Sequence, residues 1–357
     1  MGAIFSAVDH EFMARALRLA ALGLNTTTPN PRVGCVLVKD GVVVGEGWHE
    51  RAGEPHAEAH ALQRAGGAAR GATAYVTLEP CAHFGRTPPC ADALVAAGVG
   101  RVVAAMEDPN PQVAGEGMAR LRAAGVDCAV GLMAPEAAEL NIGFVSRMTR
   151  GRPWLRLKVA ASLDGKTALN NGKSQWITGA AARRDAHAWR ARSCAVLTGF
   201  GTVRDDDPRL TVRDVPCTRQ PLRIVVDSRL ETPAAALVLS GGGTLVFAAR
   251  AGSMPGAEVV VLPDANGKVD LAAMLIELGR RGVNEVLVEA GHRLNASLMA
   301  AGLVDELLIY QAPILVGDRA RGMFDLAELT DLAGVWRVNI LERRQIGADT
   351  LLRARLA

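Results

Sequence analysis

Apolar side chains in the first 50 residues follow a helical spacing and then a strand-like spacing. Residues 9–22 carry apolar side chains three and four positions apart, with Asp9 as a candidate N-cap, and predict an amphipathic helix. Apolar runs at 35–38 and 42–47 flank Asp40 and Gly41, a pair typical of a tight turn. The sequence therefore predicts a helix followed by a β-hairpin.

Extended and helical patterns alternate from there to residue 147. The predicted strands are 73–78, 101–106 and 126–131, and the predicted helices are 57–65, 90–97, 117–124 and 135–147. This alternation is typical of a layered α/β domain. The run Arg150-Gly-Arg-Pro153 then interrupts the pattern, and we predict a domain boundary there, which divides the chain into 1–149 and 150–357.

The second half repeats the alternation but ends differently. Its predicted strands are 154–160, 194–199, 222–227, 244–249, 258–262, 285–289, 306–313, 335–341 and 351–355. Its predicted helices are 181–192, 270–280 and one that follows Gly291. The last three strands follow one another without a helical pattern between them, which predicts antiparallel pairing and hence a mixed sheet.

Composition and charge narrow the classes of function. The net charge is only +3, and aromatic residues make up 4% of the chain, so we expect no nucleic-acid partner. No apolar run approaches the length of a membrane span and no signal peptide precedes the first helix, so we expect a cytoplasmic protein without a membrane partner. The six cysteines show no disulfide-framework spacing, which fits a reducing compartment.

Candidate metal ligands occur where strands and helices are predicted to begin or end. His56 precedes the helix predicted at 57–65, and Cys90 begins the helix predicted at 90–97. Cys81 follows the strand predicted at 73–78. One imidazole and two thiolates suit Zn²⁺ and leave a fourth position for water, which the ion can activate near neutral pH. Glu58, two residues after the histidine, is the candidate proton carrier. This order matches the His-x-Glu…Pro-Cys-x-x-Cys signature of zinc nucleobase deaminases, except that eight residues separate the cysteines.

These residues also have simpler interpretations. A single histidine or cysteine is most often a packing residue, but here three ligands and an acid occur in the required order. The segment 82–89 contains glycine and prolines, so it can turn back and bring both sulfurs to one ion. His60 lies one helical turn after His56 and is better explained by packing, because the cysteines supply the remaining ligands.

The second half suggests a bound cofactor without a dinucleotide fingerprint. No predicted strand is followed by Gly-x-Gly-x-x-Gly, which argues against an ordinary Rossmann domain. The strand-to-helix junctions at 198–203 and 290–295 nevertheless offer free backbone amides for a pyrophosphate. The alternative is that these glycines serve tight turns only.

Several motifs together resemble the bifunctional deaminase/reductase family of riboflavin biosynthesis. They are His56–Glu58, Thr77–Cys90, Asp108–Val113, Ala161–Lys166, Ser174–Thr178, Asp206–Pro208 and Val288–Gly291. The match runs in register from about Glu11 to the end, and the long spacing between the cysteines is that family's own. The resemblance implies a cytidine-deaminase-like α/β/α domain followed by a dihydrofolate-reductase-like domain with a mixed sheet.

The resemblance also implies chemistry and partners. The first domain would remove the 2-amino group of a phosphoribosylated diaminopyrimidinone by hydrolysis, and the second would use NADPH to reduce the ribosyl group to a ribityl chain. The substrate is then a small molecule, each chain holds one zinc ion, and the protein is a homo-oligomer, either a dimer or a tetramer.

The family pattern assigns residues by position. It places zinc at His56, Cys81 and Cys90, and the proton donor at Glu58. It places NADPH at Ala160, Trp176, Thr202, Asp206, Ser228, Gly291, His292, Arg293, Leu294, Asn295, Ala296 and Ser297. It places the substrate of the reductase at Ser174, Arg190, Leu210, Arg213 and Glu289. His292 departs from the family pattern, in which a small residue or proline is commoner.

Side-chain chemistry supports part of this assignment. Arg190 and Arg213 suit bidentate binding of a phosphate, although without the resemblance a solvated surface arginine would be the simpler explanation. Lys158 and Asp164 lie near the first strand of the second half and are candidates to polarise the reacting carbon. Asp164 and Gly165 are equally well explained as a turn.

Two other classes of function remain open from the sequence. A nucleic-acid editing deaminase would share the zinc chemistry but needs a basic groove and stacking aromatics. A zinc-stabilised scaffold would need a fourth protein ligand, and none lies at a suitable spacing. NADPH binding by the second half separates the riboflavin hypothesis from both.

Overall fold

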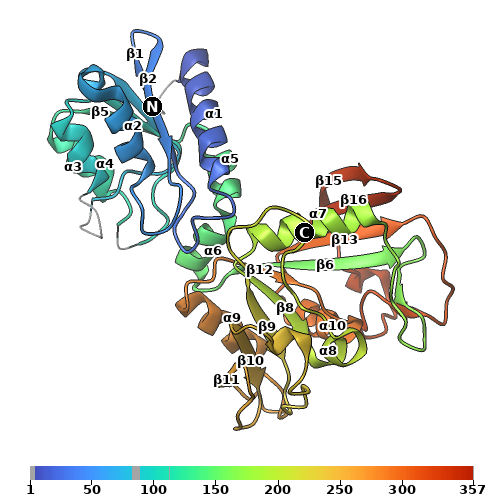
Figure 1. Ribbon diagram of the computed structural model, residues 1–357. Coiled ribbons are helices and arrows are strands. Elements are labelled where there is room, and N and C mark those ends of the chain that lie inside the picture. The colour runs from blue at the N-terminus through green and yellow to red at the C-terminus, as the bar shows by residue number, and fades with distance from the viewer. Residues whose placement is uncertain (1–4, 83–88, 112, 357) are drawn as a thin grey trace. The chain divides into compact units, whose positions relative to one another are not determined.

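The chain folds into two compact units, Met1–Gly151 and Arg152–Ala357. Figure 1 shows the computed structural model, which describes residues 5–82, 89–111 and 113–356. Each unit has its own sheet and its own buried apolar clusters. No helix in the described ranges combines the length and apolar character that a membrane crossing requires.

The first unit is built on a five-stranded sheet with the order β2-β1-β3-β4-β5. Its strands are β1 (Gly34–Lys39), β2 (Val42–Trp48), β3 (Thr73–Val76), β4 (Arg101–Ala104) and β5 (Asp127–Val130). Its α-helices are α1 (Ala7–Leu22), α2 (Ala57–Ala65), α3 (Cys90–Ala96), α4 (Glu116–Ala123), α5 (Ala134–Leu140) and α6 (Ile142–Arg150). The predicted hairpin is confirmed as the antiparallel pair β1–β2, while β3, β4 and β5 run parallel.

Helices cover both faces of this sheet (Figure 1). Apolar residues of α1 and α5 pack on one face, and those of α2, α3 and α4 pack on the other. Glycine allows α2 to lie directly on β2, because a Cβ at Gly47 would approach the Ala57 carbonyl oxygen to 2.6 Å. The predicted α/β/α layering is confirmed, and the start of α2 is held against the sheet.

The second unit is built on a nine-stranded sheet with the order β11-β10-β9-β8-β12-β6-β13-β16-β15. Its strands, with a separate two-stranded β7–β14 pair, are β6 (Trp154–Ser162), β7 (Lys166–Ala168), β8 (Ala195–Gly199), β9 (Leu222–Val226), β10 (Thr244–Ala248), β11 (Glu258–Val261), β12 (Glu285–Val288), β13 (Glu306–Ala312), β14 (Arg321–Gly322), β15 (Val338–Ile346) and β16 (Asp349–Leu356). Its α-helices are α7 (Ala180–Arg192), α8 (Phe200–Asp206), α9 (Leu271–Arg280) and α10 (His292–Ala300).

The mixed character predicted for this sheet is confirmed. The strands from β11 to β13 are parallel to their neighbours, and β16 and β15 continue the sheet in antiparallel order. Helices α9 and α10 pack on one face, and α7 and α8 pack on the other. Parallel strands bring their carboxyl ends to one edge of a sheet, where ligands usually bind.

Three predicted boundaries were wrong. Ser6, not Asp9, is the N-cap of α1; Asp9 completes a capping box by accepting from the Ser6 amide at 2.8 Å. The helix predicted over 135–147 is two helices, because the Asn141 side chain bonds the backbone of Arg32 instead of continuing the turn. The strand predicted at 335–341 lies at Val338–Ile346, where it pairs with β16.

Asp9 also anchors the first unit, and this sets a pH dependence of stability. Burial raises the pKa of its carboxyl group, but hydrogen bonds from Ser6 and Tyr75 and the charge of Arg101 outweigh burial and lower the pKa to about 2. A carboxylate whose pKa is lowered by folding stabilises the fold above its unfolded pKa, near 4, and loses that effect as pH falls toward 2.

We therefore expect Asp9→Asn to lower the free energy of unfolding by about 2 kcal/mol at pH 7. The difference from the parent protein should shrink steadily below pH 4. Denaturant titrations at several pH values measure both effects. Asp40→Asn is the matched control, since Asp40 is exposed in the hairpin turn and its substitution should change little. A difference that does not depend on pH would contradict this role for Asp9.

Candidate active sites

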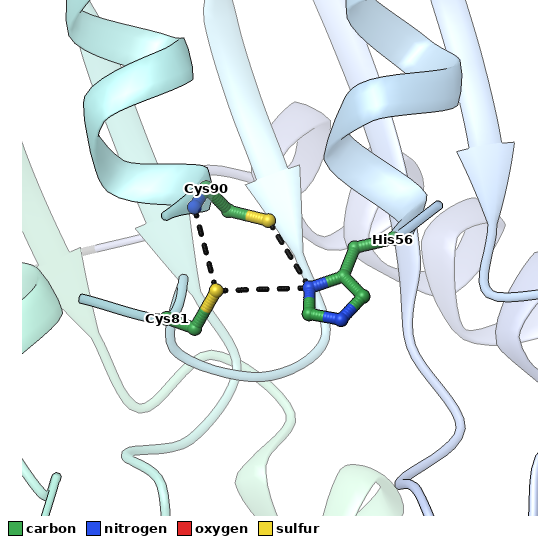
Figure 2. Close-up of side chains that lie close together, drawn as sticks. All are labelled: His56, Cys81 and Cys90. Atoms are coloured by element: carbon green, nitrogen blue, oxygen red, sulfur yellow. Dashed lines mark hydrogen bonds between the residues drawn. The ribbon is translucent and has the colours of Figure 1, made fainter. Parts of the chain in front are cut away.

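Three potential metal ligands of the first unit converge on one point (Figure 2). His56 is the N-cap residue of α2, Cys90 is the first residue of α3, and Cys81 follows β3. His56 Nδ1 lies 3.3 Å from Cys90 Sγ and 3.6 Å from Cys81 Sγ. Tetrahedral Zn²⁺ with ordinary bond lengths would hold nitrogen and sulfur about 3.5 Å apart. The three residues therefore fit one zinc ion.

The Cys81 thiol has the chemistry of a metal ligand, whereas the hydrogen bond with Cys81 and then burial raise the pKa of the Cys90 thiol. The hydrogen bond with Cys90 is the largest influence on Cys81 and, together with His56, lowers the pKa of the Cys81 thiol to about 4 against the effect of burial. The Cys90 amide donates to Cys81 Sγ at 3.4 Å. A thiolate is the form in which cysteine binds metal. Residues 83–88, which include most of the connecting segment expected to turn back, lie outside the described residues.

The described part of the chain offers this cluster three ligands and no fourth from His, Cys, Asp or Glu. A structural zinc site is normally closed by four protein ligands, whereas a catalytic site keeps one position open. His60 is not among the ligands. It packs against Gly47, where an added Cβ would lie 2.5 Å from the His60 Cβ. One histidine and two cysteines are a donor set that occurs in catalytic zinc sites.

Glu58 lies in the first turn of α2 and is 3% exposed. Burial raises the pKa of its carboxyl group, and the neighbouring His56 only partly opposes that shift. A carboxyl group with a raised pKa holds and releases a proton closer to neutral pH than an ordinary glutamate does. Its place beside the ligands suits a proton carrier.

Two further residues beside the zinc ligands carry no signal in the sequence pattern. His49 is 2% exposed, and its ring lies edge-on to that of His56 with the centroids 5.4 Å apart. Its Nδ1 donates to the Pro55 carbonyl oxygen, and its Nε2 accepts from Asn30 Nδ2, each at 3.1 Å. These bonds link the hairpin and the loop before it to the residue preceding His56. Neither His49 nor Asn30 belongs to a recognisable spacing pattern.

Glu79 was also missed. Its carboxylate accepts from the backbone amides of Asp108, Gly115 and Met118 at 2.9–3.1 Å. These bonds draw the start of α4 against the Pro80–Cys81 segment, where a Cβ at position 117 would lie 1.9 Å from the Pro80 carbonyl oxygen. The Glu79 carboxylate therefore holds the start of α4 in place, and the glycine at 117 leaves room for the backbone next to Cys81.

The second unit contains a cleft of about 1410 Å³ at the carboxyl ends of its parallel strands. Most residues that the sequence assigned to cofactor or substrate line it: Ala160, Ser174, Trp176, Arg190, Thr202, Asp206, Leu210, Arg213, Ser228, Glu289, Gly291, His292, Arg293, Leu294 and Ser297. Asn295 and Ala296 do not. They are buried on the inner side of α10, where Asn295 donates to the Met323 carbonyl oxygen.

One group of charges lies inside the cleft. Arg190 forms a bidentate pair with Glu289 at 2.5 and 2.9 Å, and Lys158 Nζ lies 3.7 Å from the same carboxylate. Burial raises the pKa of Glu289, but Arg190 and then Lys158 outweigh burial and lower it to about 2. Asp164 does not line the cleft; it accepts from Ser162 Oγ and from the amides of Val316 and Gly317, as a turn residue does.

The segment that follows α8 carries two more of the predicted substrate residues. The Arg213 amide donates to His187 Nδ1 at 3.2 Å, which ties this segment to α7. Leu210 has a positive φ of 52°, and it is buried in the core beside the cleft. Ser174 Oγ donates to Asp206 at 3.0 Å, which joins the predicted substrate and cofactor residues.

The start of α10 fits the pyrophosphate of a dinucleotide. Its N-cap, Gly291, has no side chain to cap the first amides, and a Cβ there would lie 3.7 Å from Thr202 Oγ. Leu294 packs against Gly199, so the first turn of α10 lies beside the β8–α8 junction. A histidine at position 292 leaves these backbone amides in place.

Comparison with known proteins covers both units. Residues 6–106 match the model described as the cytidine and deoxycytidylate deaminase zinc-binding region, and residues 153–352 match the RibD C-terminal domain. The chain is 51% identical to riboflavin biosynthesis protein RibD of Escherichia coli K12, over 96% of this chain and 98% of that protein. It is 49% identical to RibD of Haemophilus influenzae, over 98% and 97%.

Solved structures agree with the sequence relatives. A structure of Acinetobacter baumannii RibD superposes with a TM-score of 0.93 at 44% identity and covers 98% of this chain and 99% of that one. The diaminohydroxyphosphoribosylaminopyrimidine deaminase/5-amino-6-(5-phosphoribosylamino)uracil reductase of Thermotoga maritima superposes with a TM-score of 0.89 at 33% identity, over 98% and 99%.

Proposed function

The chain belongs to the RibD family, and we propose that its two units perform two consecutive steps of riboflavin biosynthesis. The first unit deaminates 2,5-diamino-6-(5-phosphoribosylamino)pyrimidin-4-one to 5-amino-6-(5-phosphoribosylamino)uracil. The second unit reduces the ribosyl group of that product to a ribityl chain with NADPH. The observation that carries the proposal is the presence in one chain of a three-ligand zinc site beside a buried glutamate and of a cleft lined by the predicted reductase residues.

In the deaminase, His56, Cys81 and Cys90 hold the metal. Zinc, when bound, supplies the Lewis acidity that makes water a nucleophile at neutral pH. Glu58 accepts a proton from the water and delivers protons to the ring nitrogen and to the departing amine. The carbon forms a bond to oxygen and loses its bond to nitrogen, so one water is consumed and one ammonia is released.

In the reductase, the chain holds the sugar phosphate next to the cofactor. NADPH, when bound, supplies a hydride for C1′ of the sugar as its bond to the ring oxygen breaks, and that oxygen gains a proton. Arg213 and Arg190 suit the phosphate, and Glu289 orients the Arg190 guanidinium. Lys158 faces the same cleft and carries the charge needed to polarise the sugar.

Separate expression of the two units tests this division of labour. Residues 150–357 alone are expected to bind NADPH and to reduce the deaminated substrate without zinc, because the cleft lies entirely within them. Residues 1–149 are expected to deaminate without a nicotinamide cofactor. Calorimetric titration with NADPH and assays of each step measure these outcomes. If 150–357 folds, as judged by circular dichroism and thermal melting, yet does not bind NADPH, the proposal is wrong.

We further propose that the protein is a cytoplasmic homo-oligomer, a dimer or a tetramer. The edge strand β15 supports self-association, since Val338, Ile340 and Leu341 are each more than 40% exposed along it. An open edge with exposed apolar side chains favours pairing with another chain. Light scattering on the purified protein measures the number of chains, and a monomer at micromolar concentration would contradict the proposal.

A further inference from the structure

The carboxylate that directly follows β9 is not free to bind a ribose. In many dinucleotide sites an acidic residue near a strand end bonds the 2′-hydroxyl of NAD, and a basic residue replaces it where the ligand is NADP. Asp227 is the acidic residue that follows β9, but it is 1% exposed. Its carboxylate accepts from the Thr232 amide, the Thr232 hydroxyl and the Arg229 amide at 2.7–3.3 Å. It is therefore not available to a ligand.

Two cations lie at this end of the cleft instead. The Val269 amide donates to Ser228 Oγ at 3.1 Å, which joins the end of β9 to the turn before Val269. Arg229 follows Ser228 in the chain, and Lys268 precedes Val269. The bond between Ser228 and Val269 therefore brings the backbones of Arg229 and Lys268 close together. Both line the cleft and both are exposed. Neither forms an ion pair with any residue in the described ranges.

The order of strands sets the direction in which a dinucleotide would lie. The Arg190–Glu289 pair and the substrate residues mark the reacting end, and the first turn of α10 beside β8 holds the middle. Strand β9 lies next to β8, on the side away from β12. A dinucleotide with its nicotinamide at the substrate and its pyrophosphate at α10 therefore extends its adenosine toward the end of β9.

We propose that Arg229 and Lys268 bind the 2′-phosphate of the NADPH adenosine and make this unit prefer NADPH to NADH. The inference rests on the proposed reductase function and adds to it the residues that select the cofactor. Glu231 and Arg204 also line this end of the cleft, and Arg204 pairs with Asp205 at 2.8 Å. A phosphate dianion gains from two unpaired cations, whereas the 2′-hydroxyl of NADH gains little.

Calorimetric titration of the zinc-loaded full-length protein with NADPH and with NADH tests the assignment. Arg229→Ala and Lys268→Ala should each weaken NADPH binding about 10-fold, and NADH binding should change less than about 2-fold. The double variant should bind the two cofactors with nearly equal affinity. Added salt should weaken NADPH binding in the parent protein more than in the double variant.

Arg250→Ala is the matched control, because Arg250 is also exposed, follows the neighbouring strand β10 and does not line the cleft. It should leave both affinities unchanged. The assignment is overturned if the variants weaken NADPH and NADH equally, if they weaken neither, or if the parent protein binds both cofactors equally well. A parent protein that binds neither cofactor would instead overturn the proposed reductase function itself.

Discussion

Glu58→Gln is expected to lower the rate of deamination about 10²–10⁴-fold while zinc content and folding stay unchanged. Glutamine keeps the shape of the buried side chain but cannot accept a proton from water or deliver one to the ring. The zinc ligands lie on separate side chains, so the metal should remain bound. Deamination followed by the release of ammonia, together with zinc analysis of the purified variant, measures both parts of the expectation.

The reductase provides an internal control for this variant. Reduction of the deaminated substrate should proceed at the parental rate, since Glu58 belongs to the other unit. Glu54→Gln is the matched substitution, because Glu54 is exposed and lies just before His56. It should retain deamination. Near-parental deamination by Glu58→Gln would remove this residue from the mechanism.

Cys90→Ser is expected to empty the zinc site and to abolish deamination. Serine replaces a soft thiolate with a hard hydroxyl that does not ionise near neutral pH, so one of three ligands is lost. Loss of the outer hydrogen-bond partners of a zinc ligand typically lowers metal affinity 10–100-fold, and loss of a ligand itself should exceed that. Plasma emission analysis after dialysis against a weak chelator measures the retained metal.

Two comparisons make this result specific. Cys128→Ser changes a half-buried cysteine of β5 that lies outside the ligand cluster, and it should retain full zinc. NADPH binding by Cys90→Ser should equal that of the parent protein, because the second unit has no comparable ligand cluster among its described residues. Full zinc occupancy in Cys90→Ser would contradict the assignment of this residue as a ligand.

Local chemistry predicted most of the elements that position the two sites. The hairpin was predicted because Asp40 and Gly41 favour the backbone angles of its turn, and both have positive φ in the structure. Helix α2 was predicted with the observed bounds, because its apolar period and the glycine that ends it are local signals. A predicted helix boundary was wrong where a side chain bonds a distant segment, as Asn141 bonds the backbone of Arg32.

Buried charge was not predicted at all. Arg156 lies in the middle of an apolar strand pattern, yet it is fully buried between Glu285 and Glu306, which come from two other strands. A charge can be buried when opposite charges meet it, and those partners are 129 and 150 residues away. Periodicity within one segment carries no information about such partners.

The sequence by itself determined the class of each half and the types of residue that carry the chemistry, because hydrophobic period, turn residues and motif order are properties of neighbouring positions. Tertiary structure alone decided which groups meet. His56 lies 25 and 34 positions from the two cysteines, and only the packing of α2, β3 and α3 on one sheet brings the three ligand atoms within 4.8 Å of one another. His49, Glu79, Arg229 and Lys268 became visible for the same reason. Hydrogen bonds and burial between distant segments place them, and no spacing along the chain encodes those contacts.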